Sequence, residues 1–105
     1  MLKMFDLTGK RALITGSSSG IGFALARGLA GAGARVILNG RNEARLAEAA
    51  ASLRDAGLTV SAMSFDVTSP AAVTAAIEKI EREDGPIDIL VKTDLAAPDA
   101  AYRRC

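Results

Sequence analysis

Short apolar runs, each bounded by glycine or polar residues, recur along the chain. They lie at residues 11–15, 36–38, 58–65 and 87–91. In the first run the hydrophobicity of Ala12-Leu13-Ile14 is continuous rather than alternating, which is typical of a strand buried on both faces of a parallel sheet. Four strands are therefore predicted, with Asp88 as the one polar interruption in the fourth.

Between these runs, apolar residues recur at helical spacing. The first such segment has its apolar positions at Ile21, Ala24, Leu25, Gly28 and Leu29, before the glycines at 31 and 33. A second helix is expected from Asn42, as its N-cap, to Gly57, and a third from Ser69–Pro70 to Gly85–Pro86. Their predicted buried positions are Leu46, Ala49, Ala50 and Leu53 in the second helix, and Val73, Ala76, Ile77 and Ile80 in the third.

This order, βαβαβαβ, predicts an α/β fold of the Rossmann type. Parallel strands need long crossover connections, and right-handed crossovers place helices on both faces of a sheet with strand order 3-2-1-4. Residues 1–91 are expected to form the N-terminal half of a dinucleotide-binding domain. The pattern stops at Lys92, so residues 92–105 are predicted to be an irregular tail and the fold to be truncated after its fourth strand.

Composition narrows the classes of function. A net charge of +1 gives no broad electrostatic reason to expect nucleic acid or a membrane surface as partner. The chain has no histidine, which excludes histidine-based catalysis and histidine-ligated metals. Its single cysteine, Cys105, leaves no internal disulfide framework, so a reducing, cytoplasmic setting is expected.

The strongest chemical signal is the glycine-rich turn from Thr15 to Gly22, which reads Thr-Gly-Ser-Ser-Ser-Gly-Ile-Gly. It follows a predicted strand and opens a predicted helix, the context that distinguishes a dinucleotide-binding turn from an ordinary one. Gly16 permits a tight turn, while Gly20 and Gly22 permit close approach of a phosphate and of the helix. The helix N-terminus favours a pyrophosphate, and Ser17, Ser18 and Ser19 are expected to add hydroxyl donors beside it.

With three residues between its first two glycines, this turn resembles the fingerprint of the short-chain dehydrogenase/reductase family. Three further segments resemble that family: Phe5–Lys10, Phe65–Thr68 and Gly85–Val91. The resemblance covers about residues 5–91 and is closest to the gluconate 5-dehydrogenase-like branch. It implies an NAD(P)-dependent oxidoreductase in which Asp66 and the Val67 backbone approach the adenine ring.

The end of the second strand bears on the choice of nucleotide. An NAD-preferring site usually has an acidic residue there, but this chain reads Asn39-Gly40-Arg41-Asn42. Arg41 can pair with a 2′-phosphate, so NADP is favoured over NAD. The candidate cofactor-binding residues are therefore Gly16, Ser17, Ser18, Ser19, Gly20, Ile21, Gly22, Asn39, Arg41, Asp66 and Val67.

No catalytic residue is assigned. The resemblance implies a later serine and a Tyr-x-x-x-Lys pair, yet Tyr102 is the only tyrosine and no lysine follows it. Three interpretations stay open: a short-chain dehydrogenase acting on a sugar acid or another secondary alcohol or ketone, a nucleotide-binding module without turnover, and an inactive fragment. An apolar fourth strand at the edge of the sheet also suggests a homo-oligomer paired through that edge.

Overall fold

The computed structural model describes residues 6–17 and 20–92, and within them strands and helices alternate along the chain. The elements are β1 (Arg11–Ile14), α1 (Gly20–Gly31), β2 (Arg35–Leu38), α2 (Glu43–Asp55), β3 (Val60–Ala62), α3 (Pro70–Glu83) and β4 (Ile89–Val91). The predicted βαβαβαβ order is confirmed.

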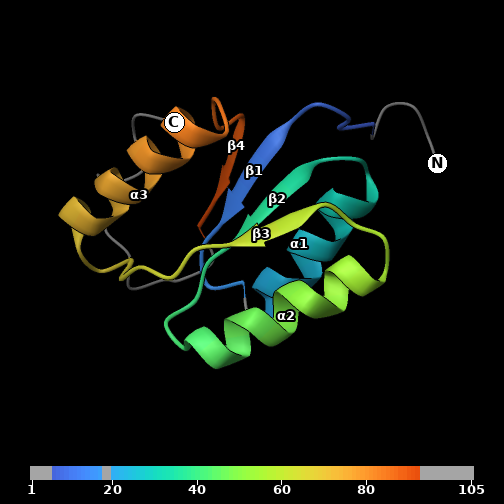
Figure 1. The fold of residues 1–105 in the computed structure, drawn as a ribbon, viewed down its shortest axis with the longest axis horizontal. Helices are drawn as coiled ribbons and strands as arrows, with labels where there is room; N and C mark the ends of the chain where they lie inside the picture. The colour runs from blue at the N-terminus through green and yellow to red at the C-terminus, as the bar shows by residue number, and fades with distance from the viewer. Residues whose placement is uncertain (1–5, 18–19, 93–105) are drawn as a thin grey trace.

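The four strands form one parallel sheet in the order β3-β2-β1-β4 (Figure 1). Ala12 of β1 lies opposite Val36 of β2 on one side and opposite Ile89 of β4 on the other. Helix α1 connects β1 to β2, α2 connects β2 to β3, and α3 connects β3 to β4 on the far side of β1, so every connection between parallel strands is a helical crossover. The predicted α/β class and the 3-2-1-4 strand order are both confirmed.

Helices cover both faces of this sheet. Figure 1 shows α1 and α2 on one face and α3 on the other. Along β1, Ala12 and Ile14 belong to the core on the α1–α2 face, whereas Leu13 belongs to the core on the α3 face. Because successive side chains of a strand point to opposite faces, burial on both faces requires a continuous apolar run.

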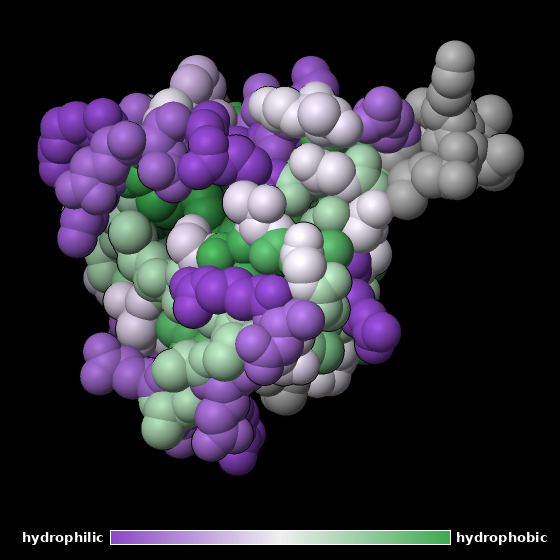
Figure 2. All heavy atoms as spheres, turned by 45° about the vertical axis from the view of Figure 1, so that its right-hand side comes forward, coloured by the Kyte–Doolittle hydropathy of each residue, from purple (hydrophilic) through white to green (hydrophobic). Residues whose placement is uncertain are grey.

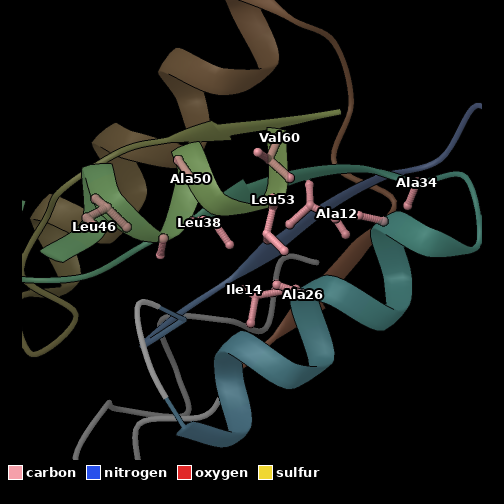
Figure 3. Close-up of a cluster of buried hydrophobic side chains, with 12 residues drawn as sticks. Ala12, Ile14, Ala26, Ala34, Leu38, Leu46, Ala50, Leu53 and Val60 are labelled. Carbon is pink, nitrogen blue, oxygen red and sulfur yellow. The ribbon is translucent and has the colours of Figure 1, made fainter. Parts of the chain in front are cut away.

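The core on the α1–α2 face is built of small and branched aliphatic side chains. Figure 3 shows these side chains, from the strands and both helices, lying between sheet and helices. The buried members are Ala12, Ile14, Ala26, Ala30, Ala34, Val36, Leu38, Leu46, Ala49, Ala50, Leu53 and Val60. Their burial contributes about 25 cal/mol per Å² of apolar surface removed from water.

Helix α1 lies where the apolar spacing predicts it, but that spacing does not mark its buried face. The residues it buries are Gly22, Ala26 and Ala30, at four-residue intervals. Ile21 is 78% exposed and Leu25 is 41% exposed. The smallest side chains of α1 therefore face the sheet, while Phe23 and Leu29 pack against the same core and are only partly buried.

Helices α2 and α3 follow their sequence signals closely. The side chain of Asn42 caps α2 by accepting a hydrogen bond from the Arg45 N–H at 3.0 Å. Ser69 caps α3 in the same way, accepting from the Ala72 N–H at 3.2 Å, and Pro70 occupies the first turn. All predicted buried positions of both helices are confirmed.

The third and fourth strands are shorter than the predicted 58–65 and 87–91. The fourth begins only at Ile89, because the Asp88 carboxylate, and not a backbone carbonyl, accepts from the Arg11 N–H at the start of β1. The Arg11 N–H donates to Asp88 Oδ2 at 2.9 Å, and the Asp88 N–H donates to the Arg11 carbonyl oxygen at 2.9 Å. The polar interruption in this apolar run therefore aligns β4 with β1.

A shallow hollow opens on the α3 side of the sheet. Its lining includes Arg11, Arg35 and Thr59, at or just before the starts of three strands, and Asp84 at the end of α3. Figure 2 shows a face on which apolar surface lies between charged side chains. The hollow lies toward the amino ends of the strands, so it is separate from the carboxyl ends, where the glycine-rich turn begins.

The sheet ends at β4 within the described ranges, and its three residues are half-buried. The division into residues 1–91 and 92–105 stays a prediction, because 93–105 lie outside the described part of the chain. None of the helices in that part combines the length and the apolar content needed to cross a membrane.

Candidate nucleotide-binding site

The carboxyl ends of β1, β2 and β3 lie side by side, so the segments that leave them meet at one edge of the sheet. These segments are the glycine-rich turn, the β2–α2 loop at 39–42 and the β3–α3 loop at 63–69. Open α/β sheets bind ligands outside the carboxyl ends of their strands. The predicted cofactor-binding residues lie on these segments, except that Ser18 and Ser19 are outside the described residues.

The glycines of the turn have two different physical roles. Gly16 and Gly20 have φ angles of 59° and 65°, a left-handed conformation that glycine adopts without strain. Gly22 permits a close approach, because a Cβ added there would lie only 2.3 Å from the Gly16 carbonyl oxygen. A side chain at residue 22 would therefore push α1 away from the turn.

The N-terminus of α1 points out of this turn and suits an anion. The first N–H groups of a helix have no partners within it, and the helix dipole adds positive potential. No acidic residue stands in the first turn of α1 to oppose a phosphate. Ile21, in that same turn, is largely exposed. The end of the helix thus fits the pyrophosphate of a dinucleotide.

Ser17 differs from the expectation that its hydroxyl serves a phosphate. Its side chain is fully buried, with 0% exposure. The hydroxyl donates to the Ile14 carbonyl oxygen at 2.7 Å and accepts from the Asn39 N–H at 2.9 Å. We correct the expected role accordingly: this hydroxyl joins the ends of β1 and β2 and does not face solvent.

Asn39 is also buried, with 1% exposure, although it was predicted to contact cofactor. Its Oδ1 accepts from the Gly16 N–H at 3.1 Å. Its Nδ2 donates to the carbonyl oxygens of Met63 and Phe65 at 3.3 and 3.2 Å. The Asn39 carboxamide therefore lies inside the site and touches all three segments that form it.

Arg41 and Asp66 are the charged groups that face outward here. Arg41 Nη2 lies 3.5 Å from Asp66 Oδ1, and the two side chains are 66% and 55% exposed. The Thr68 hydroxyl and N–H both donate to Asp66 Oδ1, at 2.6 and 2.9 Å. These two hydrogen bonds, with a smaller contribution from Arg41, hold the pKa of Asp66 below its ordinary value.

This arrangement can bind groups of both charges. The exposed Arg41 guanidinium offers a fork of donors suited to a phosphate. The ionised Asp66 carboxylate offers an acceptor suited to an amino group. The Val67 side chain is buried, at 3% exposure, so only its main chain remains for a ligand.

Sequence reasoning placed these segments but missed the internal hydrogen bonds of Ser17 and Asn39. The partners of the Asn39 side chain lie 23, 24 and 26 residues away in sequence. An Asn-Gly pair after a strand signals a turn and does not reveal such partners. The one available signal was an amide placed directly after a strand that is buried on both faces.

The family model for short chain dehydrogenases matches residues 10–94, which is most of the chain. The chain therefore belongs to the short-chain dehydrogenase family.

Within that family it is similar to proteins named for gluconate or for 5-keto-D-gluconate. It is 51% identical over 88 residues to gluconate 5-dehydrogenase of Gluconobacter oxydans (strain 621H), covering 84% of this chain and 34% of that protein. It is 45% identical over 91 residues to 5-keto-D-gluconate 5-reductase of Escherichia coli (strain K12), covering 87% of this chain and 36% of that protein. The predicted family and branch are confirmed.

A solved structure agrees. The gluconate 5-dehydrogenase of Burkholderia cenocepacia J2315, in complex with NADP and tartrate, matches with a TM-score of 0.76 and 52% identity over 82% of this chain. That match covers 34% of the solved chain. The chain thus spans about a third of the length of the curated relatives it matches.

Proposed function

We propose that this chain binds the adenosine-phosphate end of NADP(H). Arg41 carries the proposal, because its exposed guanidinium lies at the carboxyl end of β2, where residues 39–42 include no carboxylate. An acidic residue there would grip a ribose 2′-hydroxyl, whereas a guanidinium suits a 2′-phosphate. The similar gluconate 5-dehydrogenase with NADP bound supports this choice over NAD.

Each segment would hold a different part of the nucleotide. The turn at Gly16 and Gly20 and the N–H groups at the start of α1, including those of Ile21 and Gly22, would receive the pyrophosphate. Ser18 and Ser19 remain proposed hydroxyl donors beside it. Arg41 would bind the 2′-phosphate. Asp66 and the main chain of Val67 would lie beside the adenine, with the carboxylate accepting from the ring's amino group.

For a whole protein of this lineage, we propose oxidation of a secondary alcohol of a sugar acid, or reduction of the matching ketone. The relatives named gluconate 5-dehydrogenase and 5-keto-D-gluconate 5-reductase support that substrate class. Bound NADP(H) would supply the hydride chemistry.

For the 105 residues by themselves, we propose binding without turnover. The sequence holds no Tyr-x-x-x-Lys pair, and Tyr102, its only tyrosine, lies outside the described residues. None of the described residues is assigned to proton transfer. The chain's own groups would therefore bind and orient the nucleotide.

Isothermal titration calorimetry tests this proposal directly. The chain should release heat on titration with NADP+ and with adenosine 2′,5′-bisphosphate, and bind NAD+ and 5′-AMP more weakly. A cooperative thermal transition establishes that the sample is folded. A folded chain that binds neither NADP+ nor the bisphosphate overturns the proposal. The interpretation that then remains is an inactive fragment. Turnover of gluconate with NADP+ would overturn binding without turnover.

We also propose a cytoplasmic setting, as the single cysteine suggests, and a homo-oligomer paired through the outer edge of β4. The position of β4 at the outer edge of the sheet, with its residues only half-buried, supports an association of this kind. Sedimentation velocity over a range of protein concentrations tests it. A monomer at every concentration contradicts the oligomer without affecting nucleotide binding.

A further inference from the structure

We propose that Asn39 is a positioning residue whose buried carboxamide sets the spacing between the phosphate-binding turn and the adenine-side loop. The inference rests on the proposed nucleotide binding and assigns Asn39 a role other than ligand contact. Its side chain is buried, so it does not face the nucleotide. It acts through the residues that it holds.

The hydrogen bonds of the carboxamide fix its orientation. Oδ1 faces an N–H group, that of Gly16, and Nδ2 faces two carbonyl oxygens, those of Met63 and Phe65. An amide has one acceptor oxygen and two N–H donors, so one side chain satisfies the three partners only in this orientation. One residue therefore ties the turn after β1 to the strand exit after β3.

The main chain of Asn39 strengthens the same link. Its N–H donates to the Ser17 hydroxyl at 2.9 Å, and its carbonyl oxygen accepts from the Ser17 N–H at 2.8 Å. The residues on either side of this buried link face outward. Arg41 follows Asn39 by two positions, and Asp66 follows Phe65 directly. The distances among phosphate turn, Arg41 and Asp66 thus depend on Asn39.

This role requires an amide. A carboxylate at residue 39 would accept from Gly16 but would also face the carbonyl oxygens of Met63 and Phe65, with no proton to donate. Burial raises the pKa of such a carboxyl. Once protonated, it could donate to one of the two carbonyls. In Asn39→Asp, nucleotide affinity should therefore be lowest at high pH and partly recover as pH falls.

The charged groups near residue 39 do not obscure the pH dependence expected of Asn39→Asp. Gly16, Ser17, Met63 and Phe65 carry no charge, which leaves Arg41 and Asp66 on the adjoining loops. Asp66 stays ionised in this range, because Thr68 holds its pKa below the ordinary value. The 2′-phosphate of NADP+ has its second pKa at about 6, so the charge of the ligand also changes over this pH range. Each variant must therefore be compared with the unmodified chain at each pH.

The test compares Asn39→Asp with Asn42→Asp. Asn42→Asp adds the same charge three residues away, and an aspartate can still cap α2 by accepting from the Arg45 N–H. By titration calorimetry at about pH 8, Asn39→Asp should bind NADP+ roughly tenfold or more weakly than the unmodified chain. Asn42→Asp places its charge beside the proposed 2′-phosphate contact but leaves the buried link intact, so it should lose less affinity. At about pH 5.5 the deficit of Asn39→Asp should shrink, while that of Asn42→Asp stays constant.

If Asn39→Asp binds NADP+ as Asn42→Asp does at both pH values, the inference is wrong. If Asn39→Asp fails to fold at high pH, Asn39→Ser replaces it, because serine removes the amide without adding charge. A folded Asn39→Ser chain should still bind NADP+ more weakly, and unchanged affinity there overturns the positioning role.

Failure of the proposed function gives a different result, in which the unmodified chain itself does not bind NADP+. The link can then be tested without ligand by hydrogen exchange of the Gly16 amide, followed by NMR. Asn39→Ser should speed that exchange, and Asn42→Ser should not. Unchanged exchange in Asn39→Ser overturns the inference in either case.

Discussion

Helices α3 and α1 pack on opposite faces of the same sheet, yet they bury opposite kinds of residue. In α3 the large apolar side chains face the sheet, and Val73 and Ile77 are fully buried. In α1 the face toward the sheet consists of Gly22, Ala26 and Ala30, while Ile21 is mostly exposed.

The difference follows from what each helix does. Helix α3 packs on the sheet through large apolar side chains, so its hydrophobic stripe marks its buried face. Helix α1 must begin against the glycine-rich turn, where a Cβ at residue 22 would lie 2.3 Å from a backbone oxygen. Helix α1 is therefore placed by the close approach of its backbone to the glycine-rich turn, and its smallest residues mark its buried face.

The largest expected effect on the free energy of unfolding comes from truncating a buried isoleucine of α3, compared with an exposed isoleucine of α1. Ile77→Ala should lower the free energy of unfolding by about 3 kcal/mol, because a fully buried isoleucine leaves a cavity. Ile21→Ala, the matched change at an exposed site, should lower it by less than about 0.5 kcal/mol. Urea denaturation followed by circular dichroism measures both. Equal losses of unfolding free energy would show that Ile21 is buried in solution.

Adding one methyl group to a glycine of α1 tests the same comparison from the other side. Gly22→Ala should lower the free energy of unfolding by roughly 2 kcal/mol, because its Cβ meets the backbone of the turn. Gly28→Ala meets nothing within 4 Å, and should raise it by about 0.5–1 kcal/mol through helix propensity. The two variants should thus shift the urea midpoint in opposite directions. A shift in the same direction contradicts the close approach.

The fold was largely predictable because its determinants are local. Continuous apolar runs such as Ala12–Ile14 reveal strands buried on both faces, and caps such as Ser69 reveal where helices begin. The chirality of crossovers then limits the strand order. Each of these signals is read within a window of a few residues.

The site was less predictable because its internal geometry is not local. The glycines of the turn could be identified from the sequence, because glycine is the residue that adopts positive φ angles without strain and permits close backbone approach. The roles of Ser17 and Asn39 depend on partners across the sheet, and a serine beside glycines suggests a phosphate donor as readily as a buried link. The buried face of α1 could not be predicted for a related reason. The spacing of hydrophobic residues does not reveal where small residues allow a helix to approach its neighbours closely.

A smaller effect is expected at the charged end of the site, beside the start of α1. Arg41→Ala should weaken NADP+ binding about tenfold and leave NAD+ binding nearly unchanged, because only NADP+ carries the 2′-phosphate. Arg45→Ala, which removes the same charge one turn into α2, should change NADP+ affinity by less than about twofold. Titration calorimetry with both nucleotides measures the effect. Equal weakening of NADP+ and NAD+ would mean that Arg41 acts on the fold and does not bind the phosphate.

The smallest effect concerns the loop that leads into α3. Asp66 accepts from the Thr68 hydroxyl, and Asp6 accepts from the Thr8 hydroxyl at the same 2.6 Å, so the chain holds two copies of one arrangement. Both hydroxyls lower the pKa of their aspartates. A lowered pKa means that the interaction stabilises the fold above the ordinary pKa of aspartate and is lost as pH falls through the pKa in the folded chain.

Thr68→Val should therefore raise the pKa of Asp66 toward its ordinary value, and Thr8→Val should do the same for Asp6, as measured by NMR titration of the carboxyl carbons. In each variant the other aspartate serves as the internal control. Asp66 has one further partner, because Arg41 Nη2 lies 3.5 Å from its carboxylate, whereas the groups that lower the pKa of Asp6 belong to Thr8 alone. A pKa of Asp66 that stays unchanged in Thr68→Val would show that this hydroxyl does not hold the carboxylate in solution.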